Sequence, residues 1–185
     1  GRQDHRRPGR GSVQPLDVGG PPRERDALVD RALVRHLVLV DARRLRQQQL
    51  LTIVGASGAG KSSFVRAGVI PALKRGGRDV ETFILRPGRR PIAALADVLA
   101  FLSDTSGSAE EANPAALAKT LRTEPGYLGA RLRARCRKQG ANHRALLFVD
   151  QLEELYTQGI DLAEQAAFCA CIEGVADDAS SPLRV

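Results

Sequence analysis

A glycine-rich segment contains the residue types best suited to bind phosphate. It reads Gly-Ala-Ser-Gly-Ala-Gly-Lys-Ser from Gly55 to Ser62 and fits the phosphate-binding loop pattern G-x-x-x-x-G-K-[ST] at every fixed position. In such a loop the backbone N–H groups turn inward around phosphate oxygens, and the glycines permit a close approach that a Cβ would block. We therefore expect a nucleoside triphosphate to bind here. The residues predicted to contact it are Gly55, Ala56, Ser57, Gly58, Ala59, Gly60, Lys61, Ser62 and Ser63.

Two side chains of this loop have specific predicted roles. Lys61 is expected to reach the β and γ oxygens of the nucleotide, and the Ser62 hydroxyl is expected to be a ligand of Mg²⁺. The apolar run from Leu50 to Val54 predicts a short strand before the loop, and the residues after it can form a helix whose positive N-terminal end faces the phosphates. This context disfavours the alternative, an ordinary glycine-rich turn with an incidental lysine.

A second apolar run, from Ala145 to Val149, ends in the carboxylate Asp150. An apolar strand with an acid at its C-terminal tip is typical of a Walker B strand, because both faces of such a strand are covered and the acid serves the metal. Asp150 is expected to hold Mg²⁺ through a water molecule. An ordinary core strand would have the same pattern, but the pairing with a phosphate loop favours the metal-binding interpretation.

Two further acids, Glu153 and Glu154, follow Asp150 closely enough to act on the γ-phosphate. Either could orient an attacking water molecule and so serve as the catalytic base. The alternative for each is a helix start, where acids are favoured by the helix dipole. We expect one of the two to be catalytic and the other to have only this structural role.

A similar run from Leu37 to Val40, followed by Asp41, lies before the phosphate loop. Its apolar residues belong to a longer stripe with three- and four-residue steps, which is the period of a helix. We interpret this run as the end of a helix and give Asp41 no catalytic role.

With both halves of the site in place, the chain resembles the novel STAND family of signal-transducing P-loop NTPases, relatives of NACHT and AAA+ ATPases. The resemblance extends from about residue 18 to 185. Its specific segments are GASGAGKSSFVRAGVIPAL at 55–73, FILRPGRRPIAAL at 83–95 and LLFVDQLEELYT at 146–157. It implies ATP and Mg²⁺ as cofactors and self-association through the NTPase domains. The related NACHT pattern also favours Glu153 over Glu154 as the base.

The predicted fold class is α/β, a P-loop NTPase fold with a mostly parallel sheet flanked by helices. Residues 1–22 are rich in Gly and Pro and are expected to be a flexible linker, and 23–185 are expected to form the NTPase core. The segments 49–54, 80–85 and 145–150 are the predicted strands. Residues 183–185 look like the first residues of another strand. The resemblance implies that this strand carries a sensor residue and is followed by a helical lid, so we expect the chain to be part of a longer protein with other domains.

Composition limits the classes of function. The hydrophobic fraction of 43% is sufficient for a core, no run of apolar residues is long enough to span a membrane, and the N-terminus is polar, unlike a signal peptide. An odd set of three cysteines favours reduced thiols and the cytoplasm. The net charge is +7, and basic residues cluster between Arg131 and Lys138. We interpret this cluster as a solvated helix face and not as a nucleic-acid surface, because no aromatic residues are interleaved with it.

The favoured function is an ATP-binding signalling switch in which binding and slow hydrolysis change an assembly state, so the complete protein is expected to be an ATPase. ATP is preferred to GTP because the chain has no guanine-recognition motif of the Asn-Lys-x-Asp type. The alternatives are a nucleotide-dependent scaffold that does not hydrolyse and a small-molecule kinase with the same loop. The Asp150-Gln151-Leu152-Glu153-Glu154 element argues against the kinase.

Overall fold

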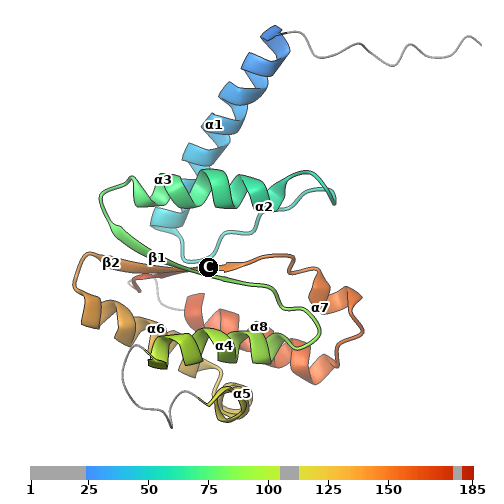
Figure 1. Cartoon of the computed structure of the whole chain (residues 1–185), viewed down its shortest axis with the longest axis vertical. Coiled ribbons are helices and arrows are strands. Elements are labelled where there is room, and N and C mark those ends of the chain that lie inside the picture. Colours follow the sequence, from blue (N-terminus) through green and yellow to red (C-terminus); the bar gives the residue numbers. More distant parts are fainter. Residues whose placement is uncertain (1–23, 105–112, 177–180) are drawn as a thin grey trace, which may run out of the picture.

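A small parallel sheet forms the middle layer of the computed structural model, which describes residues 24–104, 113–176 and 181–185 (Figure 1). Its strands are β1 (Asp79–Leu85), β2 (His143–Val149) and β3 (Leu183–Arg184), in the order β1-β2-β3. This agrees with the predicted α/β class. The predicted linker over residues 1–22 lies outside the described residues.

Helices cover both faces of the sheet (Figure 1). One layer consists of α1 (Glu24–Gln47), α2 (Lys61–Phe64), the π-helical turn η1 (Val65–Val69) and α3 (Ile70–Lys74). The opposite layer consists of α4 (Pro91–Asp104), α5 (Pro114–Thr123), α6 (Gly126–Gln139) and α8 (Leu162–Ala176), while the short α7 (Glu154–Thr157) follows β2. Within the described parts of the chain, no helix combines the length and apolarity that crossing a bilayer requires.

The two longer strands are buried because they contribute side chains to both layers. β1 and β2 pair in parallel from Asp79 opposite His143 to Leu85 opposite Val149. On β2, Leu147 points into the core under α4, α6 and α8, whereas its neighbour Leu146 packs in the smaller core under α1 and α3. This alternation explains the apolar sequence of β2 from Ala145 to Val149, since neither face of that stretch is left to water.

The predicted strand at residues 49–54 is not formed as a regular strand. The segment is extended, and two backbone hydrogen bonds join its start to the end of β3: Val185 N–H donates to Gln49 O at 2.6 Å, and Leu51 N–H donates to Val185 O at 2.9 Å. These two hydrogen bonds follow the pattern of parallel strands, but the pairing extends over Val185 alone. Farther along, Thr52 to Val54 have no strand partner among the described residues, and the side chain of Val54 is exposed.

The helical segment after the phosphate loop runs from Lys61 to Lys74, with the π turn at its centre. The sequence predicts an interruption at Pro71, which lacks the N–H that an α-helix needs at that position. The structure accommodates the proline differently. The backbone widens to a π turn over Val65–Val69 and resumes as α3, with Pro71 in its first turn. Single π turns inside helices are frequent at functional sites.

The C-terminal half of α1 is fixed to the rest of the molecule by apolar packing and by arginines. Val38, Ala42 and Leu45 recur at helical spacing and are buried in the smaller core. From β3, the guanidinium of Arg184 donates to the carbonyl oxygens of Leu45 and Arg46, two of the groups that the end of a helix leaves without intrahelical partners. A positive charge at this position also complements the negative end of the helix dipole.

Gly68 allows α1 to approach η1 closely. A Cβ built on Gly68 would lie 2.6 Å from Cγ2 of Val38, closer than carbon atoms can pack. We predict that Gly68→Ala destabilises the protein by about 1–3 kcal/mol, the usual cost of an overpacked contact. Shortening the partner in Gly68→Ala/Val38→Ala should recover part of this loss. Chemical denaturation of the two single variants and the double variant measures the coupling, and strictly additive losses would contradict the contact.

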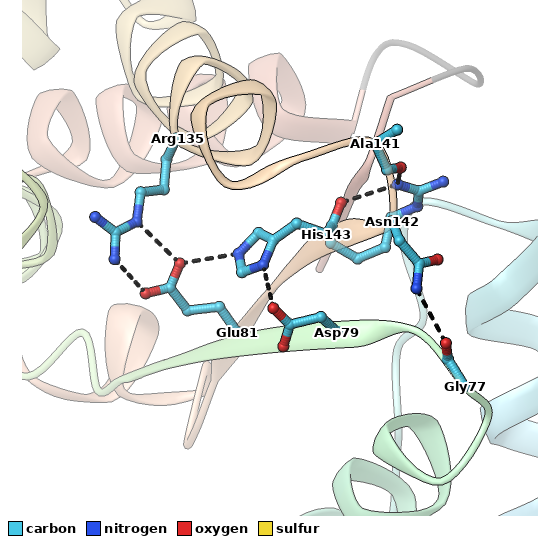
Figure 2. Close-up of polar contacts among 8 residues, drawn as sticks. Gly77, Asp79, Glu81, Arg135, Ala141, Asn142 and His143 are labelled. Carbon is cyan, nitrogen blue, oxygen red and sulfur yellow. Dashed lines mark hydrogen bonds and ion pairs between the residues drawn. The ribbon is translucent and has the colours of Figure 1, made fainter.

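Four charged or polar side chains form a cluster at the amino ends of β1 and β2 (Figure 2). Glu81 accepts hydrogen bonds from Arg135 of α6 at 3.0 and 3.2 Å and contacts Nε2 of His143 at 3.2 Å. His143 Nδ1 lies 2.8 Å from the Asp79 carboxylate. Because a neutral imidazole has a single N–H, only the protonated ring can donate to both carboxylates. The cluster joins α6 to the edge of the sheet.

The same cluster predicts a pH-dependent contribution to stability. Burial acts to raise the pKa of Glu81, but hydrogen bonds from Arg135 and His143 and their charges outweigh it and lower this pKa below its ordinary 4.5. A lowered pKa in the folded state adds stability above pH 4.5, and this stability is lost as the pH falls through the folded value.

We therefore expect Glu81→Gln to cost about 1–3 kcal/mol near neutral pH, the usual loss when a buried charged hydrogen-bonding partner is removed. As the pH falls below 4.5 and then through the lowered pKa of the folded state, the two proteins should converge in stability, because a protonated Glu81 resembles glutamine. Urea denaturation of both proteins across this range is the measurement. A constant difference at all pH values would contradict the role given to Glu81.

Candidate functional site

The predicted phosphate loop and the predicted acids meet at the carboxyl edge of the sheet. They surround a cavity of about 400 Å³ whose lining includes Lys61, Ser62, Asp150 and Glu153. Further lining comes from Ser57, Gly58, Gly60 and Ser63 of the loop and helix start and from apolar side chains of the 50–53 segment and β2. The C-terminal edge of a parallel sheet is the usual place for ligands in open α/β folds.

The loop between residue 54 and α2 has the backbone shape that its glycines permit. Gly58 and Gly60 have φ angles of 76° and 78°, a left-handed conformation that side-chain-bearing residues rarely adopt. The residues from Gly55 to Gly60 are exposed, so their backbone groups are accessible from the cavity side. Phe64 N–H donates to Gly60 O at 2.8 Å, which starts the helix immediately after the loop.

Lys61 is held across the loop by backbone oxygens. Its ammonium group donates to the carbonyl oxygens of Gly55 at 2.8 Å and of Ala56 at 3.0 Å. An ammonium group has three N–H bonds, so these two contacts orient the charge and do not exhaust its donors. Lys61 therefore places a fixed positive charge beside the loop, at the position where the sequence predicts phosphate oxygens.

Asp150 connects the end of β2 to the helix that follows the loop. The Ser62 hydroxyl donates to Asp150 Oδ1 at 2.6 Å, and Asp150 N–H donates to Leu85 O of β1 at 2.8 Å. The carboxylate is buried, with 8% of the side chain exposed. The two residues are 88 positions apart in the chain, so this contact brings the two predicted halves of the site together.

Sequence reasoning missed one participant in this contact. Arg66 Nη2 donates to Asp150 Oδ2 at 2.8 Å, so the carboxylate is bound at both oxygens. Burial acts to raise the pKa of Asp150, but hydrogen bonds from Ser62 and Arg66 and the charges of Arg66 and Arg86 outweigh it and lower the pKa. A signal was available, because Arg66 is four residues after Ser62 and so lies on the same helix face.

The turn after Asp150 is strained. Gln151 has a φ of 59°, the left-handed region that is uncommon for a residue with a side chain. Such conformations cost about 1–3 kcal/mol and persist where surrounding contacts hold them, often at functional sites. Here Asp150 before the turn is held at both carboxylate oxygens and through its N–H, and Leu155 after it is fully buried.

The structure distinguishes Glu153 from Glu154. The Glu154 carboxylate accepts a hydrogen bond from Gly88 N–H at 3.1 Å and lies 3.9 Å from Arg86, so it is tied to the loop after β1. Glu153 is exposed, precedes the first turn of α7 and lines the cavity together with Lys61 and Asp150. Of the two acids, Glu153 is therefore the one that lines the cavity.

A family model described as Novel STAND NTPase 1 matches residues 31–185, which is most of the chain. This chain belongs to the novel STAND NTPase family. The matched part of this STAND NTPase includes the glycine-rich loop, Asp150 and both glutamates, and membership confirms the resemblance drawn from its sequence. Membership also identifies a nucleotide-binding module of the signal-transducing class. Comparison with curated proteins and with solved structures gives no match.

Proposed function

We propose that this chain is the Mg²⁺-ATP-binding and slowly hydrolysing switch module of a larger signalling protein, with a P-loop NTPase fold over residues 23–185. The observation that carries the proposal is the 2.6 Å hydrogen bond between Ser62 and Asp150. It joins the last motif residue of the phosphate loop to the acid at the end of an apolar strand. In phosphate-loop NTPases these two residue types hold the metal.

The residues from Gly55 to Ser63 fit the phosphates of a nucleotide. The loop is exposed, two of its glycines have left-handed φ angles, and a helical segment begins at Lys61 with its N–H groups directed toward the loop. The N-terminus of a helix favours negative charge. Lys61 adds a full positive charge at the same place.

Ser62 and Asp150 fit a magnesium ion, because both offer the oxygen ligands that this cation prefers. In the proposed site the Ser62 hydroxyl binds the ion and Asp150 holds it, directly or through water. When bound, the ion would neutralise charge on the β- and γ-phosphate oxygens. The chain's own contribution is to fix the hydroxyl and the carboxylate, which the contacts of Asp150 with Ser62 and with Leu85 O already do.

Glu153 is the proposed base that orients the attacking water, and its exposed position on the cavity supports this choice over Glu154. Glu154 is proposed to be a positioning residue, because its contacts with Gly88 and Arg86 fix the loop after β1 against the start of α7. A carboxylate acts as a base only where it can reach the water, and Glu154 is occupied by other donors.

The proposed partners are ATP, further copies of the NTPase domain, and other domains of a longer cytoplasmic protein. Nucleic acid is not proposed, since two of the basic side chains of α6 have contacts within the chain. Arg135 pairs with Glu81, and Arg131 lies over the ring of Tyr127 at 5.9 Å. The alternatives are a scaffold that binds without hydrolysis and a small-molecule kinase. Turnover with water as the only acceptor, compared with turnover that needs another acceptor, would separate all three.

We predict that Lys61→Ala weakens ATP binding about tenfold or more, because loss of a charge-assisted contact to phosphate costs about 1.5–3 kcal/mol. Equilibrium titration with a fluorescent ATP analogue is the measurement. Lys74→Ala is the matched control, since Lys74 is exposed at the far end of the same helical segment. Equal affinity for Lys61→Ala and the control would mean that the loop does not bind the nucleotide.

Glu153→Gln should leave Mg²⁺-dependent ATP binding intact and reduce hydrolysis by about 10²-fold or more, since only the proton-accepting group is lost. Glu154→Gln removes no group from the cavity and should reduce hydrolysis less. Both variants are isosteric, which makes them controls for each other. Phosphate release by the full-length protein is the assay, and the reverse order of effects would assign the base to Glu154.

A further inference from the structure

The phosphate-loop motif and the apolar strand that ends at Asp150 do not by themselves call for an arginine at position 66. Arg66 lies in the π turn η1, one helical turn beyond Ser62, and its guanidinium donates to Asp150 Oδ2 at 2.8 Å. The side chain is 48% exposed, so solvent and solutes reach it. It is therefore a cation in direct contact with the proposed metal-holding carboxylate.

Two features of the structure fix this cation in place. The guanidinium carbon lies 6.0 Å from the ring centroid of Phe148, a cation–π arrangement. Phe148 and Asp150 are two residues apart on the same side of β2, so one arginine side chain stacks on the first and binds the second. Arg66 also lies within the π turn, where the wider backbone changes the directions in which successive side chains leave the helix.

The contact changes the charge that an incoming divalent ion would meet. Ser62 occupies Oδ1 of Asp150 and Arg66 occupies Oδ2, so both carboxylate oxygens already accept hydrogen bonds. The guanidinium neutralises the carboxylate, and Lys61 balances the other acid of the cavity lining, Glu153. A divalent cation alone would therefore enter a site without net negative charge, which gives it little electrostatic attraction.

We propose that Arg66 is the resident cation of Asp150 and competes with Mg²⁺ for Oδ2, so that the metal binds tightly only together with the phosphates of a nucleotide. This inference rests on the proposed nucleotide site. The phosphates supply the negative charge that makes the exchange of guanidinium for metal favourable. In the nucleotide-free protein, Arg66 holds the carboxylate in position without a metal.

The test compares the affinity of the nucleotide-free parent and its variants for Mn²⁺. Electron paramagnetic resonance measures the concentration of the free ion. Arg66→Gln removes the charge and should bind Mn²⁺ about tenfold more tightly than the parent, the change expected when one charged hydrogen bond is no longer in competition. Arg66→Lys keeps the charge and should stay close to the parent. Arg75→Gln removes the same charge at the exposed far end of the helical segment and should also match the parent.

A second arm measures the Mg²⁺ concentration at which binding of a fluorescent ATP analogue is half enhanced. This concentration should fall about tenfold in Arg66→Gln. The effect should vanish in the Asp150→Asn background, because the competition acts through that carboxylate. Circular dichroism verifies folding of each variant, and Arg66→Met, which also removes the charge, takes the place of Arg66→Gln in both arms if Arg66→Gln does not fold.

The proposal is overturned if Arg66→Gln binds Mn²⁺ no better than the parent, or if no variant binds Mn²⁺ at all. It is also overturned if Arg66→Gln weakens nucleotide binding in the presence of a metal chelator, since Arg66 would then contact phosphate. Failure of the parent to bind any nucleotide would instead refute the proposed function. The Mn²⁺ comparison contains no nucleotide, so the two failures are distinguishable.

Discussion

The parallel pairing of β1 with β2 brings the carboxyl ends of both strands to one edge of the sheet. The elements of the candidate site meet at that edge. Asp150 extends the pairing by one hydrogen bond to Leu85 O, after which the chain leaves the sheet through the strained turn at Gln151. The loop after β1 then meets Glu154 through Gly88. The helix after the glycine-rich loop crosses over the same edge, where Ser62 and Arg66 reach the carboxylate.

Arginine joins elements throughout this fold. Arg184 links β3 to the end of α1, Arg46 of α1 donates to Ala72 O of α3, and Arg122 of α5 pairs with Glu164 of α8. A guanidinium group offers five N–H donors in a planar fork, which suits it to backbone oxygens and carboxylates on a neighbouring element. These three positive charges are thus used in contacts within the molecule.

Local sequence patterns were sufficient to predict most of the elements and the two halves of the site. The helical assignment of the run ending at Asp41 is confirmed. The predicted strand at 49–54 was wrong, because strand formation depends on a partner, and only its start has one among the described residues. The Arg66 contact and the difference between Glu153 and Glu154 depend on residues distant in the sequence, so patterns within one segment do not contain them.

The fixing of α1 at one end gives it the mechanics of a lever. The helix has 24 residues, and at about 1.5 Å per residue it is about 36 Å long. Its C-terminal end is bound to the phosphate-loop helix through Val38 and Gly68 and to β3 through Arg184, while its other end projects from the body of the molecule (Figure 1). A tilt of about 5° at the bound end would displace the far end by about 3 Å, given that length. A small movement of the bound end of α1 beside the cavity would therefore become a larger displacement at the other end of the helix.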